Sequence, residues 1–157
     1  MESNPPHSVA FRSANSEDLP AIVQMLADDD LAKSRESTGG AVTEAYRMAF
    51  AAIERDNQNH LIVGEVDGKV IAVLQLTFIP NLTYNGGWRA QIEGVRVDRS
   101  LRGQGVGRQL IQYAVDRARG RKVAIVQLTT DKRRPEVISI YESLGFRASH
   151  EGMKLWL

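Results

Sequence analysis

The sequence predicts a single α/β domain of the α+β type, in which about four helices flank a mixed central sheet of six to seven strands. Three observations predict this fold. Strand-like and helix-like stretches alternate along the chain, Asp67-Gly68 joins two apolar stretches, and apolar residues recur at helical spacing after a glycine-rich segment at 102–107. A length of 157 residues fits one domain with a core of its own.

The first part of the chain predicts a short strand and two helices. Val9–Arg12 is a candidate strand, and Ser16 can cap the helix that follows, with Pro20 early enough in it to be tolerated. Residues 35–40 are expected to form a loop. A second helix follows, and its inward face is expected to consist of Val42, Ala45, Met48, Ala49 and Ala52.

The middle of the chain predicts three strands. His60–Val66 and Lys69–Leu82 are rich in Val, Ile and Leu, which indicates burial on both faces of a sheet. Asp67-Gly68 between them is typical of a two-residue hairpin turn. Asn85-Gly86-Gly87 turns the chain into the third strand, Trp88–Val97.

The last part predicts two helices and three strands. The helix after the glycine-rich segment is followed by the strand Val123–Leu128. Pro135 can begin the last helix at its first position, and Gly145 can end it. Phe146–His150 and Met153–Leu157 are expected to form a final hairpin. An exposed final strand of this kind is compatible with a homodimer.

Composition excludes several classes of function. Lys and Arg number 20 against 19 Asp and Glu, so the net charge of +1 gives no sign of a nucleic-acid or membrane partner. Cysteine is absent, which excludes disulfides, thiolate metal sites and a cysteinyl acyl-enzyme. The three histidines show no ligand spacing, so we predict no metal. Residues 1–8 are expected to be a flexible tail before a domain at 9–157, and without a signal segment we expect a cytoplasmic protein.

The glycine-rich segment predicts a phosphate site. A turn that leaves a strand and opens a helix presents unpaired backbone N–H groups to an anion, and Arg102 and Arg108 add positive charge. A nucleotide-triphosphate loop requires Lys-Ser or Lys-Thr after the last glycine, and a dinucleotide fingerprint requires Gly or Ala at position 108; Arg108-Gln109 satisfies neither. The residues predicted to bind the phosphates are Arg102, Gly103, Gln104, Gly105, Val106, Gly107 and Arg108.

The same segment resembles the acyl-coenzyme A loop of the GNAT N-acyltransferase superfamily, Arg/Gln-x-x-Gly-x-Gly/Ala, matched here by Arg102, Gly105 and Gly107. About 40 residues later, the segment Ile140–Phe146 is similar to a late helix of that family, Phe-Tyr-x-x-x-Gly-Phe. The resemblance covers about residues 9–157. It implies a GNAT-like fold, acetyl-CoA as the acyl donor and coenzyme A as the product.

The resemblance also implies where the donor and the catalytic groups lie. The backbone of Val95 and Val97 would pair with the pantetheine arm as an added strand does, and Gly94 suits a bulge beside them. Glu93 is the predicted general base, because its apolar neighbours would desolvate it and raise its pKa; the alternative is an exposed glutamate at a strand end. Tyr141 is the predicted general acid for the departing thiolate, although it also fits the inward stripe of its helix.

We therefore predict an N-acetyltransferase in which a primary amine of a small molecule, peptide or protein attacks the thioester directly in a ternary complex. The alternative is a catalytically silent acyl-CoA-binding regulator, against which Glu93 and Tyr141 argue. Arg134 stands where the family often has asparagine, and the cationic run at 132–134 could meet a phosphate or be solvated. The residues considered for the acceptor side, each with an alternative as solvated surface or core, are Asp28, Asp29, Asp30, Glu36, Glu44, Phe78, Tyr84 and Trp88.

Overall fold

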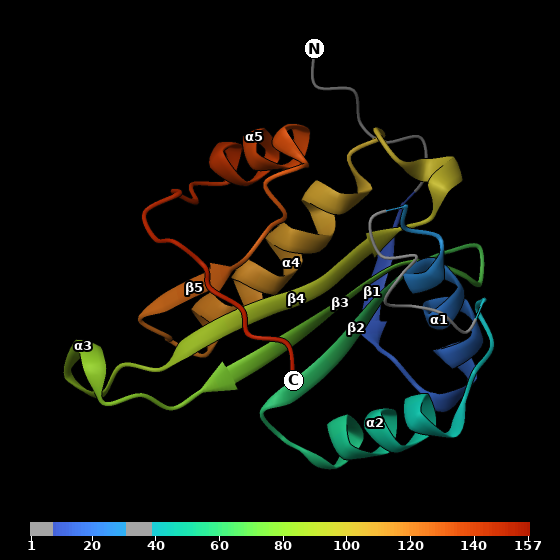
Figure 1. The fold of residues 1–157 in the computed structure, drawn as a ribbon, viewed down its shortest axis with the longest axis horizontal. Helices are drawn as coiled ribbons and strands as arrows, with labels where there is room; N and C mark the ends of the chain where they lie inside the picture. The colour runs from blue at the N-terminus through green and yellow to red at the C-terminus, as the bar shows by residue number, and fades with distance from the viewer. Residues whose placement is uncertain (1–7, 31–38) are drawn as a thin grey trace.

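The computed structural model describes residues 8–30 and 39–157. The expected tail at 1–8 and the expected loop at 35–40 therefore lie mostly outside the described residues, and Glu36 lies wholly outside them. The described residues form one sheet with helices on both of its faces, as Figure 1 shows. The predicted α+β fold is confirmed.

The sheet has five strands in the order β1-β2-β3-β4-β5. Neighbours are antiparallel from β1 to β4, and β5 joins β4 in parallel. The sheet is therefore mixed, as predicted. The strands are β1 Ala10–Ser13, β2 Asn59–Val66, β3 Lys69–Ile79, β4 Arg89–Val97 and β5 Ile125–Leu128.

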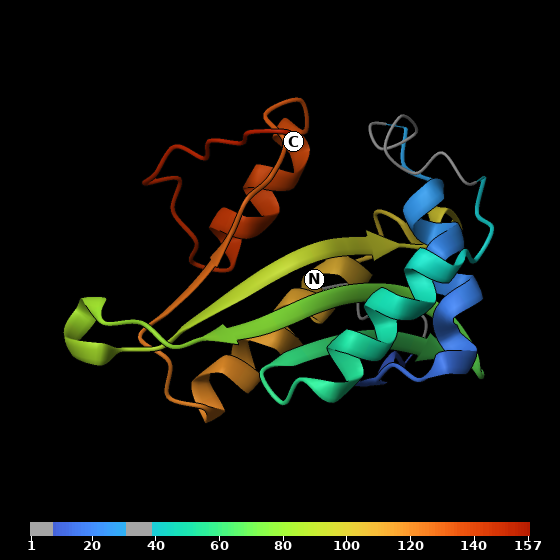
Figure 2. The ribbon, with the colours of Figure 1, turned by 60° about the horizontal axis from the view of Figure 1, so that its bottom comes forward.

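Two apolar layers hold the helices against the sheet. On one face the stripe of α4 packs on β3 and β4, through residues such as Leu110, Ile111 and Ala114. On the other face α1 and α2 cover β2 and β3 (Figure 2). Because β2 and β3 meet apolar side chains on both faces, the middle of each strand is a continuous apolar run, 61–63 in β2 and 70–74 in β3. The helices are α1 Leu19–Ala27, α2 Glu44–Arg55, α3 Thr83–Gly86, α4 Val106–Gly120 and α5 Pro135–Ser143.

Three local predictions from turn chemistry are confirmed. Asp67 and Gly68 both have positive φ, 49° and 77°, which is the conformation of the tight turn expected between β2 and β3. Pro135 is the first residue of α5, where its missing N–H costs no helical hydrogen bond. Gly145 follows the end of α5 with φ of 92°, a left-handed conformation that favours glycine.

The predicted cap at Ser16 is wrong by one residue. Asn15 caps a 3-10 turn, η1 (Ser16–Asp18), by accepting a hydrogen bond from the backbone of Glu17, while Asp18 accepts one from the backbone of Asn15. The Asp18 carboxylate also receives two hydrogen bonds from Arg12 of β1. A tertiary ion pair therefore fixes the start of α1, and local sequence could not reveal that partner.

The predicted inward face of α2 is wrong except for Val42, which lies before the helix and packs partly buried against the cluster around Phe50. Phe50 is the buried residue of the helix, with Tyr46 and Ile53 partly buried on the same side, whereas Met48 is 66% exposed. Ala45, Ala49 and Ala52 are exposed as well. Burying an aromatic ring removes more apolar surface from water than burying several methyl groups, so the helix turns Phe50 toward α1.

The expected final hairpin is absent from the structure. Residues 147–157 form no strand and are exposed throughout, so the sheet of the described residues ends at β5 with five strands, where six to seven were expected. The apolar alternation that predicted strands is real, but a strand needs a partner for its backbone groups. The segment passes the end of β5 near Thr129 and does not run beside it.

Candidate active site

The glycine-rich segment forms an open turn between β4 and α4. The chain leaves β4, makes a 3-10 turn at Arg99–Leu101, and enters α4 at Val106. Gly103 and Gly105 have φ of 75° and 82°, and a Cβ built on either residue would meet nothing within 4 Å. These two positions therefore combine a backbone that favours glycine with open space in front of it.

The buried side chain of Val106 holds the start of α4 against the sheet, so the glycines before it face solvent. Val106 is 4% exposed and anchors the start of α4 in the core. A Cβ on Gly107 would lie 3.6 Å from Cγ2 of Val97, so the helix start packs closely on β4. Gln109 donates its backbone N–H to the carbonyl of Gly105, which leaves the earlier N–H groups of the helix start without helical acceptors. The turn has the geometry of an anion site.

Arg102 and Arg108 flank the turn as predicted. Nε of Arg102 donates to the carbonyl of Val97 at 3.1 Å, and its Nη2 donates to the carbonyl of Asp28 at 3.3 Å. Arg108 is exposed and donates to the hydroxyl of Ser143, at the end of α5. The turn is thus tied to α1 on one side and to α5 on the other.

Beside this turn, β4 has a free edge. Its parallel pairing with β5 ends at Ile92, so residues 93–97 have no partner strand on that side within the described chain. Gly94 has φ of 62°, and the register of β4 against β3 slips there, because Glu93 faces Gln75 while Arg96 faces Val73. The predicted bulge at Gly94 is confirmed. Backbone groups near Val95 and Val97 are available to an added extended chain, since each carbonyl has two lone pairs.

Glu93 lies at the bulge with its side chain exposed. Apolar neighbours in the sequence predicted that this carboxylate would be desolvated, and its exposure contradicts that prediction. Ile92 is buried, but it points to the opposite face from Glu93, because side chains alternate along a strand. The protein alone does not take Glu93 out of water, so any desolvation there would have to come from a bound substrate.

Tyr141, the predicted general acid, packs against the edge of the core. It is partly buried in α5, and its ring packs against Phe146 with centroids 5.9 Å apart. Burial raises the pKa of Tyr141 above its ordinary value near 10, and the charges of Arg96 and Arg134 partly oppose that shift. The phenol therefore keeps its proton at neutral pH.

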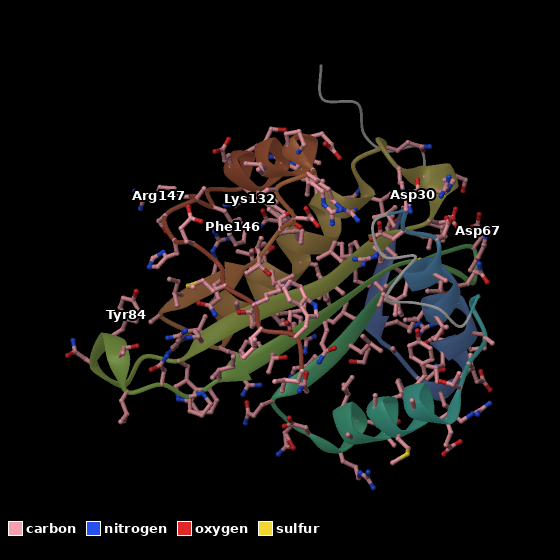
Figure 3. The ribbon with its side chains drawn as sticks, viewed as in Figure 1. Asp30, Asp67, Tyr84, Lys132, Phe146 and Arg147 are labelled. Carbon is pink, nitrogen blue, oxygen red and sulfur yellow. The ribbon has the colours of Figure 1, made fainter. Side chains whose placement is uncertain are left out.

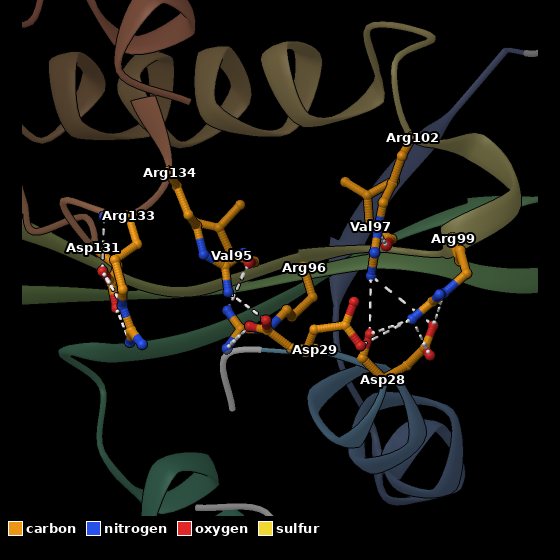
Figure 4. A network of polar contacts seen from close by, with 11 residues as sticks. Asp28, Asp29, Val95, Arg96, Val97, Arg99, Arg102, Asp131, Arg133 and Arg134 are labelled. Atoms are coloured by element: carbon orange, nitrogen blue, oxygen red, sulfur yellow. Dashed lines mark hydrogen bonds and ion pairs between the residues drawn. The ribbon is translucent and has the colours of Figure 1, made fainter. Parts of the chain in front are cut away.

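An arginine–aspartate network joins α1, β4 and α5 in front of the free edge (Figure 4). Asp28 pairs with Arg99 at 2.9 Å. Asp29 is 4% exposed and pairs with Arg96 at 3.0 Å and with Arg134, the residue before α5. Sequence reasoning missed Arg96, although a charged residue between two valines of a predicted donor-binding strand was a usable signal.

These ion pairs decide two questions that the sequence left open. The Asp28–Asp30 run, considered as a site for a cationic amine, is engaged by arginines. The cationic run at 132–134 is engaged by carboxylates, with Lys132 3.2 Å from Glu151 and Arg133 2.7 Å from Asp131. The Asp28–Asp30 run is therefore not held ready for a cationic substrate, and Lys132 and Arg133 are likewise paired, whereas Arg134 shares the single carboxylate of Asp29 with Arg96. Glu44 is exposed and lies 3.5 Å from Arg47 of the same helix.

The three aromatic residues considered for the acceptor pocket have different environments. Phe78 is 2% exposed and belongs to the core under α4. Tyr84 and Trp88 are 60% and 37% exposed, and Figure 3 shows Tyr84 at the protruding tip formed by α3. Within residues 8–30 and 39–157, no cluster of His, Asp or Glu could hold a metal ion, and no helix is long and apolar enough to cross a membrane.

Comparison with known proteins identifies the family of the chain. The sequence profile of the Acetyltransferase (GNAT) family matches residues 21–146. A crystal structure described as a transcriptional regulator from Bacillus halodurans C-125 superimposes with a TM-score of 0.92 and 47% identity, over 96% of this chain and 100% of that one. The aminoalkylphosphonate N-acetyltransferase of Salmonella typhimurium is 26% identical over 140 residues, 89% of this chain and 86% of that protein. The glucosamine 6-phosphate N-acetyltransferase of Trypanosoma brucei brucei is 33% identical over 88 residues, 56% of this chain and 58% of that protein.

Proposed function

Because the chain belongs to the GNAT acetyltransferase family and is an acyltransferase, we propose that it transfers an acetyl group from acetyl-CoA to a primary amine by direct attack in a ternary complex. Members of this family use acetyl-CoA. One observation carries the proposal for this chain: the open glycine turn at the start of α4 lies next to the unpaired edge of β4.

In this proposal the turn and the free edge together hold the donor. The N–H groups from Gly103 to Arg108 bind the pyrophosphate, and the side chain of Arg102 adds positive charge. Val95 and Val97 pair through their backbone with the pantetheine arm. The bulge at Gly94 supports this arrangement, because it bends β4 where the thioester would lie.

Two side chains would move the protons. Glu93 accepts a proton from the acceptor ammonium, directly or through water, and the free amine attacks the thioester carbonyl carbon. The carbon–sulfur bond then breaks as Tyr141 donates its phenolic proton to the departing thiolate, and the attacking nitrogen gives up its second proton, directly or through water, to restore the phenol. The protonated state of Tyr141 at neutral pH supports its part. Exposure of Glu93 on the open side of the bulge supports its contact with an incoming amine.

We further propose that the acceptor is a small amine that also carries an anionic group. The acceptors named for two relatives, an aminoalkylphosphonate and glucosamine 6-phosphate, both combine an amine with a phosphorus oxyanion. In this chain Arg96 and Arg134 lie close enough to Tyr141 to influence its pKa. Guanidinium groups bind such oxyanions through paired hydrogen bonds, and Asp29 holds both arginines in place.

The test is a screen for amine-dependent release of coenzyme A. The chain has no cysteine, so a thiol reagent reports only the released coenzyme. Each phosphorylated or phosphonate amine is paired with the same amine lacking the anionic group. Release that depends on an amine supports the enzyme, and preference for the anionic member of a pair supports the acceptor class. Equal rates within every pair contradict that class and leave the acetyltransferase proposal intact.

A second function, an acyl-CoA-binding regulator without turnover, has one observation in its favour: the solved structure that is 47% identical is described as a transcriptional regulator. Binding and turnover separate the two. Acetyl-CoA at 100 times its dissociation constant should stabilise either protein by about 2.7 kcal/mol. Stabilisation without thiol release across the whole amine panel would favour the regulator.

A further inference from the structure

The face of the sheet that is turned to the viewer in Figure 1 has an apolar half and a polar half. α4 lies behind the sheet in this view, and α1 covers the apolar half through residues such as Val63 and Val73. Glu93 belongs to the polar half, because its neighbour Ile92 packs under α4 on the opposite face. The other members of the polar half are neutral and partly buried: Asn59 of β2, Gln75 and Thr77 of β3, Gln91 of β4 and Gln127 of β5.

A first chain of hydrogen bonds in the polar half starts from a carboxylate, which fixes its direction. Nδ2 of Asn59 donates to Asp56 at 3.3 Å, because a carboxylate can only accept. Oδ1 of Asn59 then accepts from Nε2 of Gln75 at 2.7 Å and from the hydroxyl of Thr77 at 2.9 Å. Gln75 keeps its carbonyl oxygen Oε1 as an acceptor, and no residue that the structure describes donates to that atom.

A second chain starts from a cation and runs in the opposite sense. Nη1 of Arg89 donates to Oε1 of Gln127 at 3.4 Å, because a guanidinium has only donors. Nε2 of Gln127 in turn donates to Oε1 of Gln91 at 2.6 Å. Gln91 keeps its amide N–H groups as donors, and their one contact, with the carbonyl of Ile92, is long at 3.5 Å.

Both chains end beside the proposed base. Gln75 lies directly opposite Glu93 in the pairing of β3 with β4, and side chains so placed have Cβ atoms about 5 Å apart. Gln91 precedes Glu93 by two residues on the same face, a separation of roughly 7 Å along the strand. One hydrogen-bond acceptor and one donor, both uncharged, therefore flank the carboxylate. Their complement is a neutral group that both donates and accepts, such as a hydroxyl or an amide.

We propose that Gln75 and Gln91 bind a hydroxyl or amide group that the acceptor carries beside its amine. The group donates to Oε1 of Gln75 and accepts from Nε2 of Gln91. This inference rests on the proposed function, since it requires the amine to react next to Glu93. Arg96 follows Glu93 along β4 and Gln91 precedes it, so an acceptor with an anionic group would extend to both sides of its amine.

The test compares ethylamine, ethanolamine and glycinamide, which carry respectively no further polar group, a hydroxyl and an amide. A second pair, 2-aminoethylphosphonate with and without a hydroxyl on its first carbon, adds the anionic group. Each amine is assayed for coenzyme A release with the wild type and with each variant. Because a variant is compared with the wild type on the same amine, differences in amine reactivity cancel.

Two variants remove one contact each and keep the length of the side chain. Gln75→Met and Gln91→Met should each lower kcat/KM for the hydroxyl or amide amines about 3–10-fold, the loss expected for one neutral hydrogen bond. Most of the change should lie in KM, and kcat/KM for ethylamine should stay within twofold. Gln112→Met is the matched control, because Gln112 lies on α4 and donates to Asp116, and this variant should behave as the wild type does on every amine.

The outcomes separate this proposal from the proposed function. Equal losses on all amines, or no loss on the hydroxyl and amide members, would overturn the proposal and leave the acetyltransferase intact. No coenzyme A release with any amine would overturn both. If one methionine variant loses its cooperative thermal transition, the other carries the test, since the two glutamines belong to separate chains of hydrogen bonds. Loss of the transition in both would make the polar half purely structural and would contradict the proposal.

Discussion

The variant Gly105→Ala, compared with Gly68→Ala, tests whether the turn at the start of α4 binds the donor. The two glycines have nearly the same conformation, with φ of 82° and 77°, and a Cβ on either would meet nothing within 4 Å. Alanine in this left-handed region costs about 1–2 kcal/mol. Both variants should therefore lose a similar amount of stability, roughly 2–4 °C in melting temperature for each kcal/mol.

The two variants should differ in donor binding. At position 105 the new methyl group stands in the open space where the proposed pyrophosphate meets the helix N–H groups, whereas position 68 lies in the hairpin between β2 and β3. Loss of one or two hydrogen bonds to a charged group costs about 1.5–3 kcal/mol, which is ~10–100-fold in Kd. Calorimetric titration with acetyl-CoA measures this. If Gly105→Ala binds as the wild type does, or if both variants weaken equally, the turn is not the donor site.

Three further predictions concern the protons of the site and the start of α1. Tyr141→Phe should lower kcat by about 10²-fold with little change in melting temperature, whereas Tyr113→Phe, a control at a partly buried position of α4, should leave kcat unchanged. Glu93→Gln should lower turnover at every pH while its Kd for acetyl-CoA, measured by calorimetry, stays within twofold; unchanged turnover would remove this residue from the mechanism. Asp18→Asn should destabilise the chain by about 2 kcal/mol at pH 7 in urea unfolding. Hydrogen bonds from Arg12 hold the pKa of Asp18 below its ordinary value, so its contribution is present above about pH 4, and the gap to the variant should close as the pH falls further.

Sequence predicted those features whose cause is local. Asp67, Gly68 and Gly145 have left-handed backbone conformations that few residue types favour, and Pro135 lacks the N–H that a helix interior needs, so their structural roles can be read directly. The glycine turn could be predicted for the same reason. Val106 is a buried side chain that anchors the start of α4, and the glycines on either side of it leave the backbone open.

Sequence failed where the cause was a distant partner. The start of α1 depends on Arg12, a residue of another element, and the orientation of α2 depends on which side chain buries the largest surface. Residues 147–157 have the alternation of a strand without a partner strand in their own chain. The exposure of Glu93 could not be predicted either, because the burial of one strand face says little about the other.

The arginine–aspartate network links the two halves of the proposed site. Arg102 donates both to the carbonyl of Val97, on the edge proposed for the pantetheine arm, and to the carbonyl of Asp28 at the end of α1. A phosphate that draws Arg102 toward the turn would compete with both contacts. Asp28 would then be left to Arg99, and the adjoining Asp29 holds arginines from β4 and α5 beside Tyr141. Donor binding would therefore change the contacts of α1 and, through Asp29, the position of the arginines on the proposed acceptor side. We expect from this that acetyl-CoA binds before the amine.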